Sequence, residues 1–329
     1  MNHLHLIIPA LLLPAEAAGV YAGLRLPYWE KLLARSRRST MPAATLEARL
    51  CDAFGVTGLA PLRALADGLV TKEGYCLCAD PVELQMQPSQ VMLQPDVVCT
   101  EAEAHQLCAS LNAHFAEEGL CFFAPHPERW YLQAQSLGEV MMVPLRAAAG
   151  RDVRTLLPQG ADARRWWRLI NEMQMLLHQH PVNAARQQAG KPAINSLWVW
   201  GESSACVPHP AIDAAGSLDG LVTLCARASG VALLDDLPGL LASRHERGMW
   251  MEAGLQEAWQ RGDLYTYRAR LEKLENEIAA PVWQSICAGK LHTLTLEVLA
   301  DETVQRFELT RAGCRKIWRR RQPLTVYLE

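Results

Sequence analysis

The sequence predicts an α/β protein with a mostly parallel central sheet, helices on both faces of the sheet, and an antiparallel hairpin near the C-terminus. Segments with strand character alternate with segments with helix character along the 329 residues, which is typical of an α/β fold. Residues 194–200 are almost entirely apolar, as in a strand that is buried on both faces. Residues 291–299 and 304–309 alternate between apolar and polar side chains around a short polar connection, and this pattern predicts the hairpin.

The individual elements are predicted from periodicity and from the residues that begin and end them. Apolar residues at steps of four, three and four between Trp166 and Leu177 predict a central helix, which Pro181 ends before a polar connector. Thr100 and Glu103 form the pattern of a capping box at the start of another helix. The other expected strands lie at 3–13, 75–79, 91–93, 120–124, 130–135 and 231–234, and the other expected helices at 28–38, 45–54, 61–69, 218–229, 263–288 with an interruption at Pro281, and from 311 onward.

Composition and charge are typical of a soluble globular protein. Hydrophobic residues make up 50% of the chain and charged residues 20%. The net charge of −3 provides no attraction of the whole chain to nucleic acid or to an anionic membrane. We expect a single α/β domain spanning residues 1–329, with a loop near 150–160 as the place where it would subdivide.

The N-terminal and cysteine patterns indicate a cytoplasmic protein. The apolar stretch from Leu4 to Leu13 has no Lys or Arg before it and contains Pro9, so we expect a buried strand instead of a signal peptide. The ten cysteines include no C-x-x-C motif, and Cys76 and Cys78 lack the second pair that a zinc site needs. We therefore expect reduced thiols, no metal site and no membrane partner.

A candidate ligand site follows the strand at 194–200. In open α/β sheets, ligands bind beyond the carboxyl ends of the strands. Gly201 would let the backbone approach a ligand closely, and Ser203 and Ser204 would offer hydroxyl groups to it. The residues proposed for this site are Asn195, Trp198, Trp200, Gly201, Ser203, Ser204 and Asp235, of which Asn195 is expected to fix the connector. An ordinary strand exit with two indoles in the core fits the same pattern, and so does a helix cap at Asp235.

Catalytic and cofactor motifs are missing from the sequence. His178 and His180 are two residues apart at a helix end, where a metal pair needs a spacing of four. No G-x-S-x-G frame, G-x-G-x-x-G loop or Walker loop is present, so no cofactor is expected and the catalytic residues stay unknown. Six basic residues near the C-terminus would contact nucleic acid or an acidic partner, or would form a solvated helix face: Arg311, Arg315, Lys316, Arg319, Arg320 and Arg321.

Four segments of the chain resemble the RpfE-type regulatory proteins of proteobacteria. They are A-D-P-V-E-L at 79–84, R-W-Y-L at 129–132, E-M-Q-M-L-L-H-Q-H-P-V-N at 172–183 and I-N-S-L-W-V-W-G at 194–201. The resemblance extends through 281–291 to Trp318. Many members of this family are similar to cofactor-independent phosphoglycerate mutases of the alkaline phosphatase superfamily. The resemblance therefore implies a phosphatase-superfamily-like core.

The mutase chemistry implied by this resemblance needs an Asp at the end of the first strand, a Ser or Thr nucleophile, and Asp and His ligands for two metals. Here the first strand runs into Ile8, Pro9 and Ala10, and there is no D-H-G motif. We therefore expect a non-catalytic or catalytically degenerate regulatory or binding protein of the RpfE type, with a small molecule or a protein as its partner. Two alternatives stay open: a phosphate-ester enzyme similar to the mutases, and a nucleic-acid accessory protein that uses the basic C-terminal helix.

Overall fold

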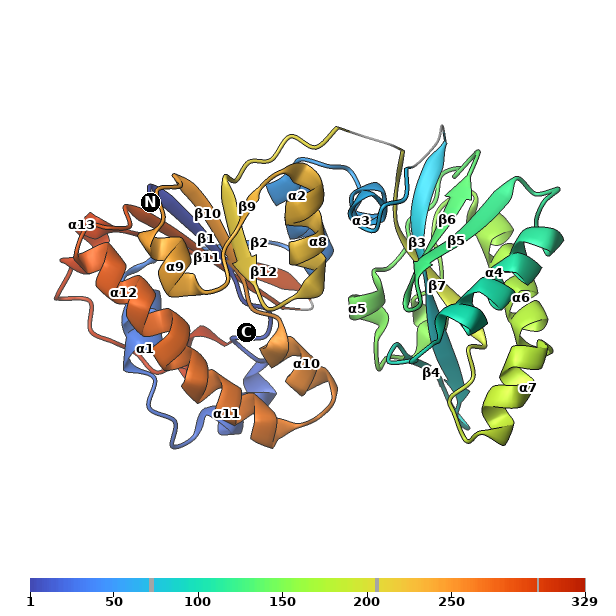
Figure 1. Ribbon diagram of the computed structural model, residues 1–329. Coiled ribbons are helices and arrows are strands. Elements are labelled where there is room, and N and C mark those ends of the chain that lie inside the picture. The colour runs from blue at the N-terminus through green and yellow to red at the C-terminus, as the bar shows by residue number, and fades with distance from the viewer. Residues whose placement is uncertain (71–73, 205–206, 301, 329) are drawn as a thin grey trace. The chain divides into compact units, whose positions relative to one another are not determined.

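The chain forms two compact units. The computed structural model describes residues 1–70, 74–204, 207–300 and 302–328 (Figure 1). Unit 1 combines Met1–Gly55 with His209–Glu329, and unit 2 is the continuous segment Val56–Pro208. Residues 150–160, where a subdivision was expected, lie inside unit 2. The single domain stays a prediction, because compactness alone does not measure whether the units unfold together.

Unit 1 is built on a mixed sheet. Its strands are β1 (His3–Ile7), β2 (Arg37–Pro42), β8 (Ala214–Ser217), β9 (Ala232–Leu233), β10 (Arg247–Met251), β11 (Thr293–Leu299) and β12 (Thr303–Thr310). Their order is β2-β12-β11-β1-β10-β8-β9. The five strands from β11 to β9 are parallel, and β12 is antiparallel to both of its neighbours, β11 and β2. The expected fold class, including the β11–β12 hairpin near the C-terminus, is confirmed.

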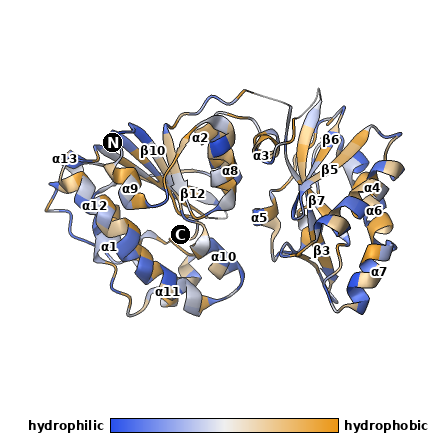
Figure 2. Cartoon of the chain, viewed as in Figure 1, coloured by the Kyte–Doolittle hydropathy of each residue, from blue (hydrophilic) through white to orange (hydrophobic). Residues whose placement is uncertain are grey.

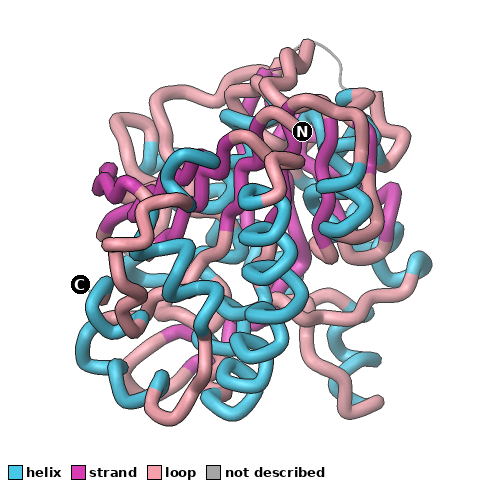
Figure 3. Tube along the Cα trace, turned by 90° about the vertical axis from the view of Figure 1, so that its left-hand side faces the viewer, coloured by secondary structure: helices cyan, strands magenta, loops and turns pink. Residues whose placement is uncertain are grey.

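Helices cover both faces of this sheet. One face carries α1 (Pro27–Arg35), α9 (Leu237–Ala242), α11 (Leu264–Leu274) and α12 (Ala280–Cys287), and the other carries α2 (Leu46–Phe54) and α8 (Gly220–Ser229) (Figure 1). Helices of the first face lie in front of the strands when the unit is viewed from its side (Figure 3). The shorter elements are η1 (Ala15–Tyr21), α10 (Gly254–Gln260), η3 (Glu275–Ala279), α13 (Arg311–Cys314) and η4 (Leu324–Tyr327).

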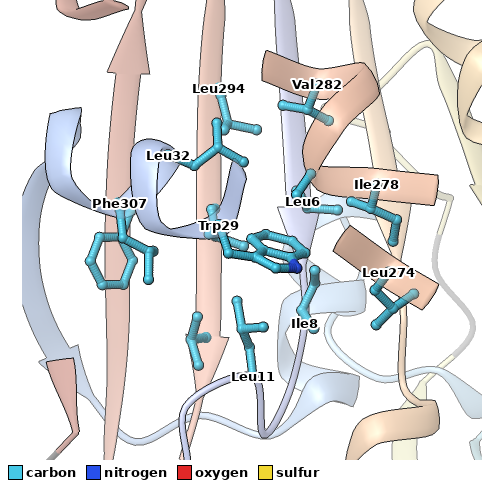
Figure 4. Packing of buried hydrophobic residues seen from close by; sticks show 14 of the residues in the cluster. Leu6, Ile8, Leu11, Trp29, Leu32, Leu274, Ile278, Val282, Leu294 and Phe307 are labelled. Carbon is cyan, nitrogen blue, oxygen red and sulfur yellow. The ribbon is translucent and has the colours of Figure 1, made fainter. Parts of the chain in front are cut away.

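The main core of unit 1 gathers around Trp29, which is fully buried (Figure 4). Side chains alternate along a strand, so Leu4 and Leu6 of β1 face this core. His3 and His5 point to the opposite face, where α2 and α8 lie. The alternation thus separates an apolar face from a face that holds polar side chains.

The interruption predicted at Pro281 takes the form of a π-helical turn, η3, between α11 and α12. A proline lacks one N–H donor and its ring clashes with the carbonyl four residues earlier, so a wider turn relieves both problems. The same turn places Glu275 against the start of α1. Its carboxylate accepts hydrogen bonds from the N–H groups of Tyr28 (2.6 Å) and Trp29 (3.1 Å).

Unit 2 is an antiparallel sheet with its own core. Its strands are β3 (Tyr75–Met86), β4 (Val91–Gln94), β5 (Leu120–His126), β6 (Arg129–Ala134) and β7 (Ser196–Ser204), and its helices are α3 (Ala60–Ala66), α4 (Glu101–His114), α5 (Leu145–Ala148), η2 (Val153–Thr155), α6 (Ala163–His178) and α7 (Pro181–Gln188). The order is β4-β3-β6-β5, and β7 pairs with β3. The capping box at Thr100 is confirmed. Much of each sheet is coloured hydrophobic, whereas α7 and α11 show hydrophilic stretches (Figure 2).

The strand predicted at 194–200 is present as β7, but the expectation that it belongs to the parallel sheet is wrong. Within the described ranges β7 pairs only with β3, and the pairing is antiparallel. β7 is apolar on both faces because α6 packs on one side and α3 on the other. Helices on both faces can bury an edge strand as completely as a central parallel strand, so the apolar run could not distinguish the two. The carboxyl end of β7 is therefore not the edge of a parallel sheet.

Two helix predictions also need correction. The polar connector contains α7, which begins at Pro181, because a proline at the first helical position starts a helix as readily as it ends one. The final helix, α13, covers only Arg311–Cys314, so Arg315 and Arg319 do not share a helical face. None of the helices in the described ranges is both long and apolar enough to cross a membrane.

Candidate functional site

The carboxyl ends of the parallel strands of unit 1 form one edge of its sheet. β11, β1 and β10 are neighbours in the sheet and end at Leu299, Ile7 and Met251. In α/β folds this edge is the usual place for a ligand. This edge, and not the end of β7, is therefore the candidate ligand edge of the molecule.

The exit from β1 is a strained turn that two tyrosines hold in place. Ala10 has a φ of 57°, and it is the one non-glycine residue with positive φ in the part of the chain that the structure describes. Tyr267 donates a hydrogen bond to the carbonyl of Ala10 (2.7 Å), and Tyr21 donates one to the carbonyl of Leu11 (3.0 Å). Burial raises the pKa of Tyr21 to about 12, so this phenol stays a proton donor at neutral pH. Such strain often accompanies functional sites.

A buried carboxylate, Glu297, lies at the same edge on the face that α2 covers. Glu297 pairs with Ile7 in the β1–β11 register, and its side chain is 0% exposed. The Nε and Nη2 groups of Arg306 donate hydrogen bonds to Oε1 of Glu297, at 3.0 and 2.7 Å. His5 Nε2 and Arg49 Nε lie 3.2 and 3.6 Å from Oε2. We call His5, Arg49, Glu297 and Arg306 the Glu297 cluster.

The Glu297 cluster has more donor capacity than its carboxylate uses. Burial works to raise the pKa of Glu297, but His5 and Arg306 outweigh it and lower this pKa to about 2. The contacts from His5 and Arg49 have the distances of ion pairs but not the alignment of hydrogen bonds, so within the described ranges both nitrogens and Oε2 lack a hydrogen-bond partner. The side chains of His5, Arg49 and Arg306 are 19%, 15% and 32% exposed, whereas the unpartnered nitrogens of His5 and Arg49 are themselves buried.

The residues at this edge do not fit the two-metal centre that the mutase resemblance implies. The turn after β1 carries Pro9 and Ala10 where a carboxylate ligand would be needed. Glu252, which follows β10, is paired with Arg270 at 2.6 Å, and Asp219 caps α8. No three His, Cys, Asp or Glu side chains in the described ranges group closely enough to hold a metal ion.

The residues predicted for the ligand site belong to both units. Those from Asn195 to Ser204 lie in unit 2, whereas Asp235 lies in unit 1, exposed after β9. The Asn195 amide accepts from the N–H of Leu84 (2.7 Å) and donates to its carbonyl (3.0 Å), which anchors the connector to β3. Gly201 has a φ of 71°, a backbone conformation that suits glycine.

Trp200 and Ser203 have structural partners. The Trp200 indole N–H donates to Asp80 (2.8 Å), and Arg63 donates two further hydrogen bonds to that carboxylate, at 2.5 and 2.9 Å. Arg63 is buried and lies 5.4 Å from the Trp200 ring. The hydroxyl groups of Ser203 and Thr57 lie 2.6 Å apart. These contacts tie the α3 segment to the sheet of unit 2.

Trp198 borders an apolar pocket in unit 2. The pocket encloses about 400 Å³ when the space open to solvent is included. Its walls come from β7, α6 and the loop around η2, with Gln174 and Ser196 as the polar residues of the lining. The Trp198 indole N–H already donates to the carbonyl of Val143 at 2.8 Å. Among the residues that the structure describes, no charged side chain lines the pocket, so a phosphate ester would find no counter-charge from them there.

Sequence reasoning missed the Glu297 cluster. In the hairpin, Thr293, Thr295 and Glu297 occupy the polar positions of the alternation, which is also the pattern of a solvated strand face. One signal was available in β1, where His3 and His5 alternate with leucines in a strand expected to be buried. Polar side chains inside a buried strand need partners, and that requirement predicts a polar cluster on the adjacent strands.

Comparison with known proteins shows a distant similarity to phosphoglycerate mutases. No family model matches the chain. The chain is 35% identical over 105 residues to the 2,3-bisphosphoglycerate-independent phosphoglycerate mutase of Methanosarcina barkeri, which is 31% of this chain and 26% of that protein. It is 36% identical over 64 residues to a probable mutase of the same kind from Geobacter sulfurreducens, which is 20% of this chain and 16% of that protein. The match thus spans about a quarter or less of these relatives.

One of two similar solved structures supports the fold. The PH0037 protein from Pyrococcus horikoshii has a TM-score of 0.57 at 13% identity, over 94% of this chain and 87% of that chain. The cofactor-independent phosphoglycerate mutase from Thermoplasma acidophilum has a TM-score of 0.45 at 14% identity, over 94% of this chain and 90% of that chain. The first likeness supports the mixed α/β architecture and carries no statement about activity.

Proposed function

We propose that the protein binds a small phosphorylated acid at the Glu297 cluster and does not turn it over by two-metal chemistry. The distant similarity to phosphoglycerate mutases supports a phosphate ester as the ligand class. The observation that carries the proposal is the convergence of His5, Arg49 and Arg306 on one carboxylate at the ligand edge of a parallel sheet. Arginine suits this role because its planar guanidinium can give parallel hydrogen bonds to phosphate oxygens.

The donor groups of the cluster support phosphate binding. Arg306 uses Nε and Nη2 for Glu297, and Arg49 uses Nη1 for a hydrogen bond to Asp52 at 2.8 Å. A guanidinium has five N–H donors, so each arginine keeps donors to offer to a ligand. Glu297 holds both arginines in place. Because its negative charge repels an anion, a ligand must bind to the arginine donors that Glu297 does not use.

A regulatory role of the RpfE type agrees with binding without turnover, and it is part of the proposal together with a cytoplasmic location. A protein that senses a metabolite needs a site and a response, but no metal centre. The alternative is a phosphate-ester enzyme, and the names of the similar proteins favour it. The binding protein and the enzyme differ in metal content and in turnover, and each of these two properties can be measured.

The binding test compares 3-phosphoglycerate with glycerate at equal ionic strength, using the thermal midpoint of the full chain. We expect 3-phosphoglycerate to raise the midpoint and glycerate to leave it unchanged, because a ligand of the folded state stabilises it by mass action. Arg49→Gln should abolish the rise. The matched control is Arg247→Gln, which removes an arginine–aspartate pair (2.7 Å) at the opposite, amino end of β10.

The outcome separates the candidates. If Arg49→Gln keeps the full rise, the phosphate site lies elsewhere. Conversion of 3-phosphoglycerate to 2-phosphoglycerate, measured with and without added Mn²⁺, should be absent. Turnover that depends on Mn²⁺ would overturn the binding-only proposal and establish the enzyme alternative.

A further inference from the structure

A second surface of unit 1 combines basic and apolar side chains outside the Glu297 cluster. It is formed by the loop after α13 and the start of β2, and we call it the basic loop surface: Arg38, Arg315, Lys316, Ile317, Trp318, Arg319, Arg320 and Arg321. Ile317 and Trp318 are neighbours in this loop and are 76% and 73% exposed. Large apolar side chains exposed side by side often mark an interaction site.

The loop is ordered by contacts at both of its ends. Cys314 and Leu324 are buried in the core of unit 1 before and after it. Inside the loop, the N–H of Arg319 donates to the carbonyl of Lys316 (3.0 Å), and its guanidinium donates to the carbonyl of Ser36 (2.9 Å). The last contact joins the loop to the residue before β2. The exposure of Ile317 and Trp318 therefore belongs to a held turn and not to an unattached tail.

The loop concentrates positive charge in a chain whose net charge is −3. From Arg311 to Arg321 there are six basic residues and no acidic one. Arg321 lies 3.8 Å from Glu30, whereas the contacts of Arg319 go to backbone carbonyls that carry no formal charge. Arg38 adds an exposed arginine at the start of β2, whereas Arg37 lies opposite Glu308 in the β2–β12 pairing. The expectation of no membrane partner used the charge of the whole chain, which hides this local excess.

We propose that the basic loop surface binds an anionic lipid bilayer, with Ile317 and Trp318 inserted at the interface. Clustered Lys and Arg are attracted to anionic headgroups, and an indole side chain is favoured at the level of the headgroups. Single-stranded nucleic acid would also supply negative charge through its phosphates, and its bases could stack on Trp318. It would leave Ile317 without an apolar environment, so the adjacent aliphatic side chain favours lipid. The attachment is peripheral, through one loop.

The experiment measures sedimentation of the full chain with large vesicles of phosphatidylcholine alone or mixed with phosphatidylglycerol. We expect binding to the anionic vesicles, weaker binding as salt is raised, and little binding to phosphatidylcholine alone. The double substitution Ile317→Ala and Trp318→Ala should lower the partition coefficient roughly tenfold, and Arg315→Gln with Arg320→Gln should lower it by a similar factor.

Matched controls exclude a general effect of surface mutation. Tyr265→Ala removes an aromatic side chain that is 85% exposed on α11, and Leu218→Ala removes an aliphatic one that is 78% exposed. Both should leave vesicle binding unchanged. Vesicle binding that survives the Ile317 and Trp318 substitutions would overturn the proposal. Absence of binding to the anionic vesicles would also overturn it, and Trp318-dependent binding of a single-stranded oligonucleotide would then assign the surface to nucleic acid.

Discussion

Ala10 carries backbone strain at the carboxyl end of β1, at the point where the mutase resemblance would have required a carboxylate. Its φ of 57° is costly for a residue with a Cβ, by roughly 1–2 kcal/mol. The hydrogen bonds from Tyr267 and Tyr21 hold the turn in this conformation. The surrounding structure, and not the preference of alanine, therefore decides the path of the chain at this edge.

Ala10→Gly should stabilise the protein by up to about 1 kcal/mol, because glycine adopts positive φ without strain and loses only part of this gain to its greater freedom in the unfolded chain. The measurement is the free energy of unfolding in urea. Ala109→Gly, at an exposed position of α4, should destabilise by about 1 kcal/mol and gives the opposite sign as a control. Equal destabilisation by both changes would contradict the strain at Ala10.

Glu297 should make the stability of the protein depend on acid. Its pKa in the folded protein is lowered to about 2, so its contribution is present above the ordinary carboxyl range near pH 4.3 and is lost as the pH falls toward 2. Glu297→Gln should cost about 3 kcal/mol at neutral pH, because it leaves Arg306 without a counter-charge. It should also remove part of the acid dependence.

The free energy of unfolding of both proteins, measured from pH 7 to pH 2, checks this prediction. Glu118→Gln is the control, since Glu118 forms an exposed pair with Arg168 at 3.0 Å and should contribute less than about 1 kcal/mol. If the difference between the original protein and Glu297→Gln stays constant down to pH 2, the carboxylate does not titrate as described.

Helix α3 is joined to the sheet of unit 2 by a buried ion pair. Arg63 and Asp80 have side chains that are 6% and 5% exposed, and Trp200 completes the hydrogen bonding of the carboxylate. A charge left alone in such a place is expensive, whereas an apolar pair of similar volume can replace the ion pair at little cost. The pair therefore positions α3 more than it adds net stability.

Arg63→Leu should destabilise by about 3–5 kcal/mol, and the double change Arg63→Leu with Asp80→Leu should destabilise by less than the single change. Urea unfolding of the two single variants and the double variant forms the cycle that measures this. Arg168→Gln, on the surface of α6, should change the free energy by less than about 1 kcal/mol. A double variant that is less stable than Arg63→Leu would contradict the interpretation.

The two units are coupled by the path of the chain. Unit 2 is continuous, whereas unit 1 is made from both ends of the chain, with unit 2 between Gly55 and His209. If unit 2 unfolds, unit 1 must close a flexible loop of about 150 residues, which costs roughly 4–5 kcal/mol more than closure through a folded unit. This cost supports the prediction that the chain behaves as one cooperative domain.

We expect hydrogen exchange in rising urea to show the same midpoint for peptides from β11 in unit 1 and from β6 in unit 2. Arg63→Leu, which perturbs unit 2 directly, should lower both midpoints. Trp29→Ala, a core change in unit 1 expected to cost about 3–5 kcal/mol, is the reciprocal variant. Two midpoints that move independently would show that the units are separate domains.

Local pattern in the sequence was sufficient for most elements of the fold, because periodicity, caps and turns depend on residues close in the chain. The β11–β12 hairpin, the capping box at Thr100 and the strands β1 and β9 follow from such patterns, whereas the parallel strands β8 and β10 were not predicted. Only the tertiary structure decided which strands are neighbours. It placed β7 in an antiparallel sheet, since an apolar run reports burial and not the direction of the partner strand. It also brought His5, Arg49, Glu297 and Arg306 together from four elements, because contacts between distant segments depend on sheet order, which no local pattern encodes.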